Sequence, residues 1–301
     1  MQFFTHKGAG AIQVSGEDAL PYLQSQLTID LHSLSPLATR YGLRLNLKGR
    51  VLFGAQIIRA GEEEFWMICR DTPTRAILSC LEENIVADEV EFSEVPGEWS
   101  LTTLLGDSSE NGEGPPRELC LPAPGTALQT ENGWIYPDPR MPGPAHTLLH
   151  PADCNPAQLE GADEIGSFAL EKRRLEAQLF RPGWEVAEDA FPQEAGLEKG
   201  AVDFDKGCYL GQEVMARIHS MGNVRKRTVM VRGSGEACPN LPVPLLLGEK
   251  EVGALKSQFH HPQENFWIGA ALVHEKALPS LETEGLEQKD HAGKVFLHPD
   301  E

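Results

Sequence analysis

The stretch 41–69 constrains the fold more than any other part of the chain. Polar and apolar residues alternate over 41–47, and strand-forming residues continue over 51–59 and 64–69. Lys-Gly and Ala-Gly pairs separate the three segments, and short connections that contain glycine are typical of hairpins. We therefore expect three consecutive antiparallel strands, which must bury one face of their sheet against another layer.

Helical patterns flank this meander. A helix is expected from the Ser-Gly-Glu-Asp cap at 15–18 to about Ile29, because leucines three and four residues apart share one of its faces. A second helix should follow the Asp-Thr-Pro sequence at 71–73. A third is expected over 165–179, before an Arg-Pro-Gly stop signal. Helices packed on antiparallel strands predict an α+β fold.

The chain changes character twice along its 301 residues, which exceed what one hydrophobic core usually serves. Residues 97–160 are rich in Pro and Gly and predict a variable connection with a few strands. From Arg225 on, short strand patterns between polar turns predict a small β-barrel or sandwich. The acidic tail after Leu278 is expected to be loosely held. We expect two domains, 1–224 and 225–301, the first made of two interleaved subdomains.

The composition argues against several classes of function. The formal net charge of −19 repels nucleic acid, so no direct nucleic-acid partner is expected. No apolar run approaches about 18 residues, so no membrane partner is expected. The N-terminus carries no signal or transit pattern, which favours a cytoplasmic location. The six cysteines form no C-x-x-C pair, so we expect no resident zinc or iron–sulfur cluster.

One basic segment stands out against the acidic background. It has two readings: a solvated strand edge, which composition alone favours, or an anion-binding site. Between residues 217 and 232 there is no acidic residue, and the basic ones are Arg217, Arg225, Lys226, Arg227 and Arg232.

The segment 206–227, KGCYLGQEVMARIHSMGNVRKR, carries the most specific motif of the chain. It resembles the signature of the YgfZ family, folate-binding relatives of the glycine-cleavage aminomethyltransferase. About a dozen positions match at fixed spacing, far more than a short glycine motif would supply. The matching residues are Lys206, Gly207, Cys208, Tyr209, Gly211, Gln212, Glu213, Arg217, Gly222, Lys226 and Arg227.

The resemblance extends over nearly the whole chain and is weakest over 97–160. Gln26, Thr28 and Asp30 resemble the end of the family's opening helix, and LNLKGR at 45–50 resembles another of its segments. The resemblance implies an α+β, aminomethyltransferase-like folate-binding fold with a small C-terminal β-barrel. It also implies tetrahydrofolate as the ligand.

A folate offers a hydrogen-bonding pterin edge, an aromatic ring and an anionic glutamate tail. Glu176 resembles the carboxylate that anchors the pterin in the relatives, because a carboxylate can accept two N–H bonds. Alternatively, Glu176 pairs with neighbours on the helix surface; Glu194 is a weaker candidate. We expect Glu176 at the floor of one cavity, with Cys208 beside it and cations at its mouth. The implied folate contacts are Glu176, Lys206, Gly207, Tyr209, Gln212, Glu213, Arg217, Lys226 and Arg227.

Cys208 is the candidate reactive group. A nearby ammonium and a helix N-terminus would favour its thiolate, a nucleophile or soft-metal ligand, whereas the ordinary reading of a lone cysteine is a small buried apolar residue. Lys206 is expected to orient the folate tail or to tune this thiol. Gly207 and Gly211 would let the backbone approach a ligand closely, while Gln212 and Glu213 would serve equally as caps or supports.

One departure from the relatives bears on catalysis. The aminomethyltransferases carry an acidic pair in the strand after a Gly-Gly turn, and here Phe53 and Gly54 occupy those positions. A phenylalanine cannot accept a proton. Folate binding can survive this loss, but ordinary aminomethyl transfer is not expected.

The resemblance implies an accessory protein that binds tetrahydrofolate and serves iron–sulfur cluster assembly or repair on client enzymes, including tRNA-thiolating ones. Cys208 would contact the cluster or react, and a partner would complete the ligand set. The alternative is a folate-dependent one-carbon transferase that uses other groups. A third possibility is a scaffold without a working pocket.

Overall fold

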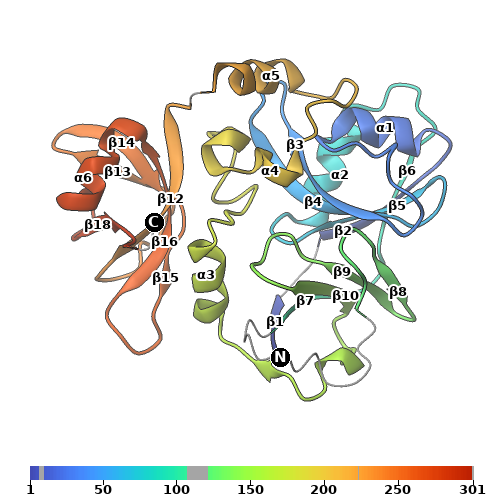
Figure 1. Ribbon diagram of the computed structural model, residues 1–301, viewed down its shortest axis with the longest axis horizontal. Coiled ribbons are helices and arrows are strands. Elements are labelled where there is room, and N and C mark those ends of the chain that lie inside the picture. The colour runs from blue at the N-terminus through green and yellow to red at the C-terminus, as the bar shows by residue number, and fades with distance from the viewer. Residues whose placement is uncertain (7–9, 107–120, 223, 300–301) are drawn as a thin grey trace.

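The computed structural model describes residues 1–6, 10–106, 121–222 and 224–299, and its framework is three β-sheets. Figure 1 shows a C-terminal barrel on one side, the two other sheets on the opposite side, and helix α3 (Ser167–Glu176) between them. This arrangement confirms the predicted α+β class and the C-terminal β-barrel. The domain boundary between residues 224 and 225 stays a prediction.

The first sheet contains the predicted meander, and all its neighbours are antiparallel. The helices α1 (Ala19–Gln26) and α2 (Thr74–Glu82) follow two of its strands. Both lie within the helices expected from the sequence. The strand order is β3 (Thr39–Leu45), β4 (Val51–Arg59), β5 (Glu64–Cys69), β2 (Gly10–Ser15) and β6 (Glu91–Glu94).

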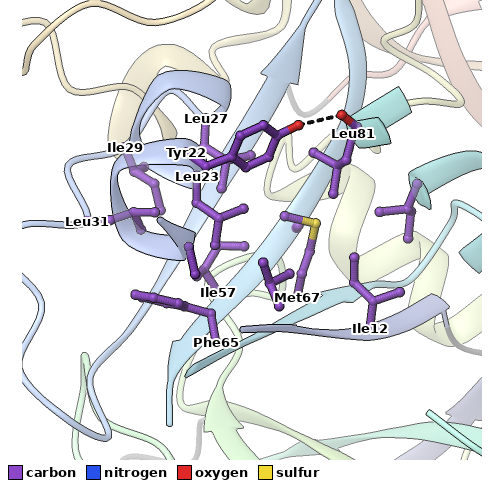
Figure 2. Packing of buried hydrophobic residues seen from close by; sticks show 14 of the residues in the cluster. Ile12, Tyr22, Leu23, Leu27, Ile29, Leu31, Ile57, Phe65, Met67 and Leu81 are labelled. Carbon is purple, nitrogen blue, oxygen red and sulfur yellow. Dashed lines mark hydrogen bonds between the residues drawn. The ribbon is translucent and has the colours of Figure 1, made fainter. Parts of the chain in front are cut away.

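A hydrophobic cluster joins α1 and α2 to this sheet. Figure 2 shows Leu23 of α1 above Ile57 and Met67 of the sheet, all fully buried. The hydroxyl of Tyr22 donates a hydrogen bond to the carbonyl of Leu81 in α2, which links the two helices. Burial of this leucine-rich face explains why the three- and four-residue spacing folds as a helix here.

The second sheet holds most of the Pro- and Gly-rich segment. It also contains β1 (Gln2–His6), next to one edge of the sheet, so the N-terminal strand belongs to a different sheet from β2. Trp66 of the first sheet packs against Trp134 of the second, with ring centroids 6.0 Å apart. The order is β11 (Asp163–Glu164), β1, β7 (Trp99–Leu105), β10 (Ala145–Pro151), β9 (Gly133–Pro137) and β8 (Leu128–Thr130).

The C-terminal sheet closes on itself, because β12 (Lys226–Gly233) pairs with both β16 (Trp267–His274) and β18 (Lys294–Leu297). The expectation of a loose tail after Leu278 is wrong: this part forms α6 (Leu278–Thr283) and two barrel strands. Its apolar residues fill the barrel core. The other strands of the sheet are β13 (Val243–Leu247), β14 (Lys250–Leu255), β15 (Phe259–His260) and β17 (Leu286–Gln288).

Short helices connect the sheets with the barrel. They are α3, the 3₁₀ turn η2 (Pro192–Ala195), α4 (Glu198–Ala201) and α5 (Gln212–Met221). Helix α3 ends before the expected residue 179, because Gln178 turns the chain with a φ of 54°. Two further 3₁₀ turns are η1 (Ala157–Leu159) and η3 (Glu275–Ala277). No helix in the described ranges is long and apolar enough to cross a membrane.

Truncating Leu281 tests whether the tail belongs to the barrel core. Its side chain is fully buried there, so Leu281→Ala should lower the free energy of unfolding by about 2–5 kcal/mol. Leu247→Ala, in the same barrel but 38% exposed, is the matched control and should cost well under half as much. Urea unfolding measures both, and equal small losses would contradict a packed tail.

Candidate functional site

A cleft of about 780 Å³ opens between the N-terminal sheets, α3 and the barrel. An inner cavity of about 40 Å³ adjoins it, and Arg70, Asp71 and Arg181 line both. We call the two together the central cleft. Its outer part is lined by Phe4, Thr5, His6, Arg70, Asp71, residues 164–167, Glu171, Arg181, Trp184 and Phe259.

Buried ion pairs form the wall of the central cleft. The Arg181 guanidinium donates to the Asp71 carboxylate at 2.9 Å and to Glu171. Behind them, Arg174 donates to Glu171 at 2.6 Å and to Glu185 at 2.7 Å. Burial opposes ionisation of Glu171, but the Arg174 and Arg181 guanidinium groups outweigh it and lower the pKa of this carboxyl. The wall therefore presents Glu171 as an ionised carboxylate.

Two guanidinium N–H donors on this wall lack partners. Nε of Arg70 and Nε of Arg181 are buried and have no hydrogen-bond acceptor among the described residues. Buried donors are nearly always paired in folded proteins. The wall can therefore offer N–H donors as well as carboxylate acceptors to a ligand edge.

Aromatic side chains form the other wall of the outer cleft. Trp184 remains 38% exposed, and its ring lies edge-to-face on Phe259 with centroids 5.8 Å apart. The Arg181 guanidinium lies 4.4 Å from the centroid of Trp184, which holds the indole by a cation–π contact. A partly exposed, fixed indole is suited to stacking on a planar ligand.

His6 lies in the same cleft as a neutral group. Burial, reinforced by the positive charges of Arg70 and Arg181, lowers the pKa of His6 to about 3. Its Nε2 lies 3.1 Å from the hydroxyl of Thr103. At neutral pH the imidazole is a hydrogen-bonding group and not a cation.

The inner cavity lacks a carboxylate from β4. Phe53 is buried in the core between the sheet and α1, on the opposite face. Gly54 lines the cavity, and a Cβ there would overlap the hydroxyl of Tyr41. The remaining volume of about 40 Å³ holds water molecules but not a pterin ring.

The expected location of Glu176 is wrong. Its carboxylate lies 3.1 Å from Lys172 on the solvent side of α3, and its side chain is 33% exposed. Glu171 points into the core instead, because five residues rotate the direction by about 140° around a helix. The alternative interpretation, in which Glu176 pairs with a neighbour on the helix surface, is therefore correct.

Lys206 has a structural role in place of the expected ligand contact. Its Nζ donates to the carbonyls of Gln24, Leu27 and Ile29, each at 2.7 Å. Gln24 lies in the last turn of α1, and Leu27 and Ile29 follow this helix, so the ammonium holds the chain where α1 ends. Burial lowers the pKa of Lys206 to about 8. Its three donor positions are thus directed at the backbone, away from any folate tail or thiol.

The remaining motif residues surround this anchor. Tyr209 is buried, and its backbone N–H donates to the Gln212 side chain at 3.4 Å. Gly211, at a φ of 83°, packs against the backbone of Asn46 and Gly49, where a side chain would clash. The 45–50 segment and the KGCYLGQE motif therefore meet, but Gly211 accommodates the chain itself and not a ligand.

Cys208 and its basic neighbours lie on the surface. Cys208 and Gly207 are exposed, and Gly207 has open space around its Cα. Lys226 is half-buried, while Arg227 pairs with Glu275 at 3.1 Å. Glu213 and Arg217 are exposed on α5. None of the residues expected to contact folate lines the central cleft, and neither does Cys208.

A second cavity of about 490 Å³ contains two of the candidate residues, Arg227 and Glu194. Glu194 is buried, accepts the Phe191 N–H at 2.9 Å and lies 3.5 Å from Arg50. Burial raises the pKa of this carboxyl. Glu194 thereby caps the turn η2, which is a structural role.

No sequence motif predicts that the residues of the central cleft form a site. The pattern around Asp71 indicates only a helix cap, and the Arg-Pro-Gly-Trp sequence at 181–184 indicates only the end of a helix. Glu171 carries no motif of its own. The one available signal was Trp184, a tryptophan directly after a turn, where an aromatic ring is often exposed for binding.

Comparisons with known proteins agree with this architecture. Residues 2–111 match the family model of the GCVT N-terminal domain. The crystal structure of glycine cleavage system aminomethyltransferase T from Bartonella henselae matches with a TM-score of 0.73, covering 99% of this chain and 84% of that one at 16% identity. The chain therefore has the aminomethyltransferase-like fold.

Sequence comparisons indicate which proteins with this fold the chain resembles. An aminomethyltransferase of Listeria welshimeri is 24% identical over 96% of this chain and 83% of its own length. The tRNA-modifying protein YgfZ of Edwardsiella ictaluri is 28% identical over 76% and 70%, respectively. A mitochondrial iron–sulfur cluster assembly factor IBA57 homolog of Neosartorya fischeri is 27% identical over 74% and 55%. The resemblance to YgfZ-type relatives of the aminomethyltransferase is confirmed.

The neutral state of His6 predicts acid sensitivity. Its pKa is about 3 in the folded protein and about 6.5 when unfolded. Below pH 6.5 only the unfolded chain takes up this proton, so stability falls as the pH drops, by up to about 1.4 kcal/mol per pH unit. Urea unfolding from pH 7 to 4 should show a shallower fall for His6→Gln. His32→Gln, at an exposed histidine, should follow the wild type; parallel curves for all three would contradict a buried neutral His6.

Proposed function

We propose that the protein binds tetrahydrofolate in the central cleft and acts as an accessory protein in iron–sulfur cluster assembly or repair. The observation that carries the folate part is the pairing of a carboxylate and guanidinium wall with an exposed aromatic wall in one cleft of about 780 Å³. This size and mixed lining are typical of small-molecule sites.

The cleft residues fit the chemistry of a folate. The pterin edge combines N–H donors with a carbonyl acceptor. Asp71 and Glu171 can accept the N–H groups, and the unpaired Nε of Arg70 or Arg181 can donate to the carbonyl. Trp184 and Phe259 can stack on a ring. Bound there, the folate would supply one-carbon chemistry, while these residues hold and orient it.

The thiol site supports the second part of the proposal. Cys208 is exposed outside the cleft, and no group of three or more His, Cys, Asp or Glu in the described segments could hold a metal ion. A cluster bound at Cys208 would thus need ligands from another protein. Relatives named as an iron–sulfur cluster assembly factor and a tRNA-modifying protein support such clients.

The alternative is a folate-dependent one-carbon transferase. The aminomethyltransferase relative aligned over 96% of the chain supports it. Against it stands β4, where Phe53 and Gly54 occupy the expected acidic positions and Tyr41 fills the space beside Gly54. Conversion of methylene-tetrahydrofolate by the purified protein would favour the transferase over the accessory role.

Removing the indole of Trp184 tests the folate site. Trp184→Ala should weaken tetrahydrofolate binding by about tenfold, because the stacking surface is lost, whereas Trp184→Phe should stay within about threefold of the wild type. Val86→Ala, at a residue 93% exposed, is the unchanged control. Isothermal titration calorimetry measures the Kd. Equal affinity for wild type and Trp184→Ala would place the folate elsewhere.

Replacing the thiol tests the client role independently. In cells that lack the natural gene, Cys208→Ser should reduce thiolation of tRNA by an iron–sulfur enzyme severalfold under oxidative stress, because the cluster contact is lost. Folate affinity should not change, since Cys208 lies outside the cleft. Cys154→Ser, at a half-buried cysteine, is the control. Undiminished thiolation with Cys208→Ser would refute the thiol role.

A further inference from the structure

One side of helix α5 is exposed to solvent along its ten residues. Met215 is its one buried residue. Its exposed positions include 213, 216, 217, 220 and 221, and this spacing places them on a single face. A surface helix ordinarily exposes polar residues, and this face also carries Ala216 and Met221. In Figure 1, α5 lies along the edge of the molecule, above the junction between the barrel and the N-terminal sheets.

Two large apolar side chains flank this face. Met221, at the end of α5, is 66% exposed, and Leu47, in the loop between β3 and β4, is 77% exposed. The loop is held against the start of α5, because Gly49 packs on Val214 and on Gly211. Exposed apolar side chains at the two ends of a helix, with polar ones between them, give a mixed surface of the kind found in protein interfaces.

The charges of this region oppose those of the whole protein. Lys48, Arg217 and Arg225 are exposed. Within the described part of the chain, no ion pair joins any of them to an acidic residue. The chain carries 45 acidic residues against 26 basic ones, so exposed, unpaired cations on α5, on the loop packed against it and on the segment that follows it favour an acidic partner. We define the α5 surface as Leu47, Lys48, Glu213, Ala216, Arg217, Ser220, Met221 and Arg225.

We propose that the α5 surface is the docking site for an acidic face of the client protein that shares a cluster with Cys208. The proposal rests on the proposed client role, because Cys208 precedes the N-cap Gly211 by three residues and is exposed beside this surface. Apolar Leu47 and Met221 would contact the partner, and the cations would orient it.

A protein partner fits this surface better than a nucleic acid. Three cations separated by Glu213 and two apolar side chains form no continuous track for phosphates, and the net charge of −19 opposes a polyanion. The surface is also distinct from the central cleft, since none of its residues lines that cleft. Folate binding and docking can therefore be tested separately.

Photocrosslinking in cells tests the docking site. The protein would carry p-benzoylphenylalanine in place of Ala216, on the exposed face of α5, or in place of Val86, which is 93% exposed elsewhere. Captured proteins are identified by mass spectrometry. The expected result is capture of acidic iron–sulfur proteins from position 216 and not from position 86. Adding Lys48→Glu, Arg217→Glu and Arg225→Glu should reduce this capture at least tenfold.

Three outcomes would overturn the docking proposal: the same proteins captured from both positions, capture from 216 that survives the three charge reversals, or crosslinked RNA as the main product. The result is separable from the client role. Capture that persists in Cys208→Ser, with tRNA thiolation undiminished, would refute the thiol role and keep the docking site. Loss of thiolation in Cys208→Ser without selective capture at 216 would keep the thiol role and refute the docking site. Calorimetry with tetrahydrofolate verifies that the triple variant is folded.

Discussion

The architecture around the central cleft depends on one buried guanidinium. Arg174 donates to Glu171 on its own helix and to Glu185 at 2.7 Å, and the Ser257 hydroxyl donates to Glu185 at 2.6 Å from the barrel. Arg181 joins the same network through Glu171. Removing one member would leave an uncompensated buried charge, which costs several kcal/mol. This network fixes α3, the Pro-Gly turn and the barrel relative to one another, and thereby sets the shape of the cleft.

The two candidate sites use different physical means. In the central cleft, charges are paired and buried, so the carboxylates keep fixed directions toward a ligand. Around Cys208, in contrast, Lys206 donates to three carbonyls at and just after the end of α1, and the backbone held in this way carries an exposed thiol. The motif thus holds the backbone that carries Cys208 and leaves the thiol itself exposed to a partner. This separation agrees with a folate that acts apart from the cluster contact.

Periodicity and turn residues were sufficient to predict the meander, the helices α1, α2 and α3, and the barrel, because these depend on local pattern and burial. The location of Glu176 could not be read in this way: a motif identifies the residue, but the face on which it lies depends on where α3 packs. The tail strand β18 was missed because a segment of four residues, KVFL, between polar stretches is too short to show a strand pattern by itself, and its pairing with β12 is not visible in the sequence. The ion network joins residues far apart in sequence, which no local pattern reports.

The contact between Tyr41 and Gly54 has an evolutionary consequence. The phenol occupies the space that any side chain at position 54 would need, so the two positions are coupled. Placing an acid there would require a smaller residue at 41 in the same step, because either change alone leaves a clash or a void. Such coupling makes a carboxylate at position 54 hard to gain by single substitutions, so the two positions are expected to change together.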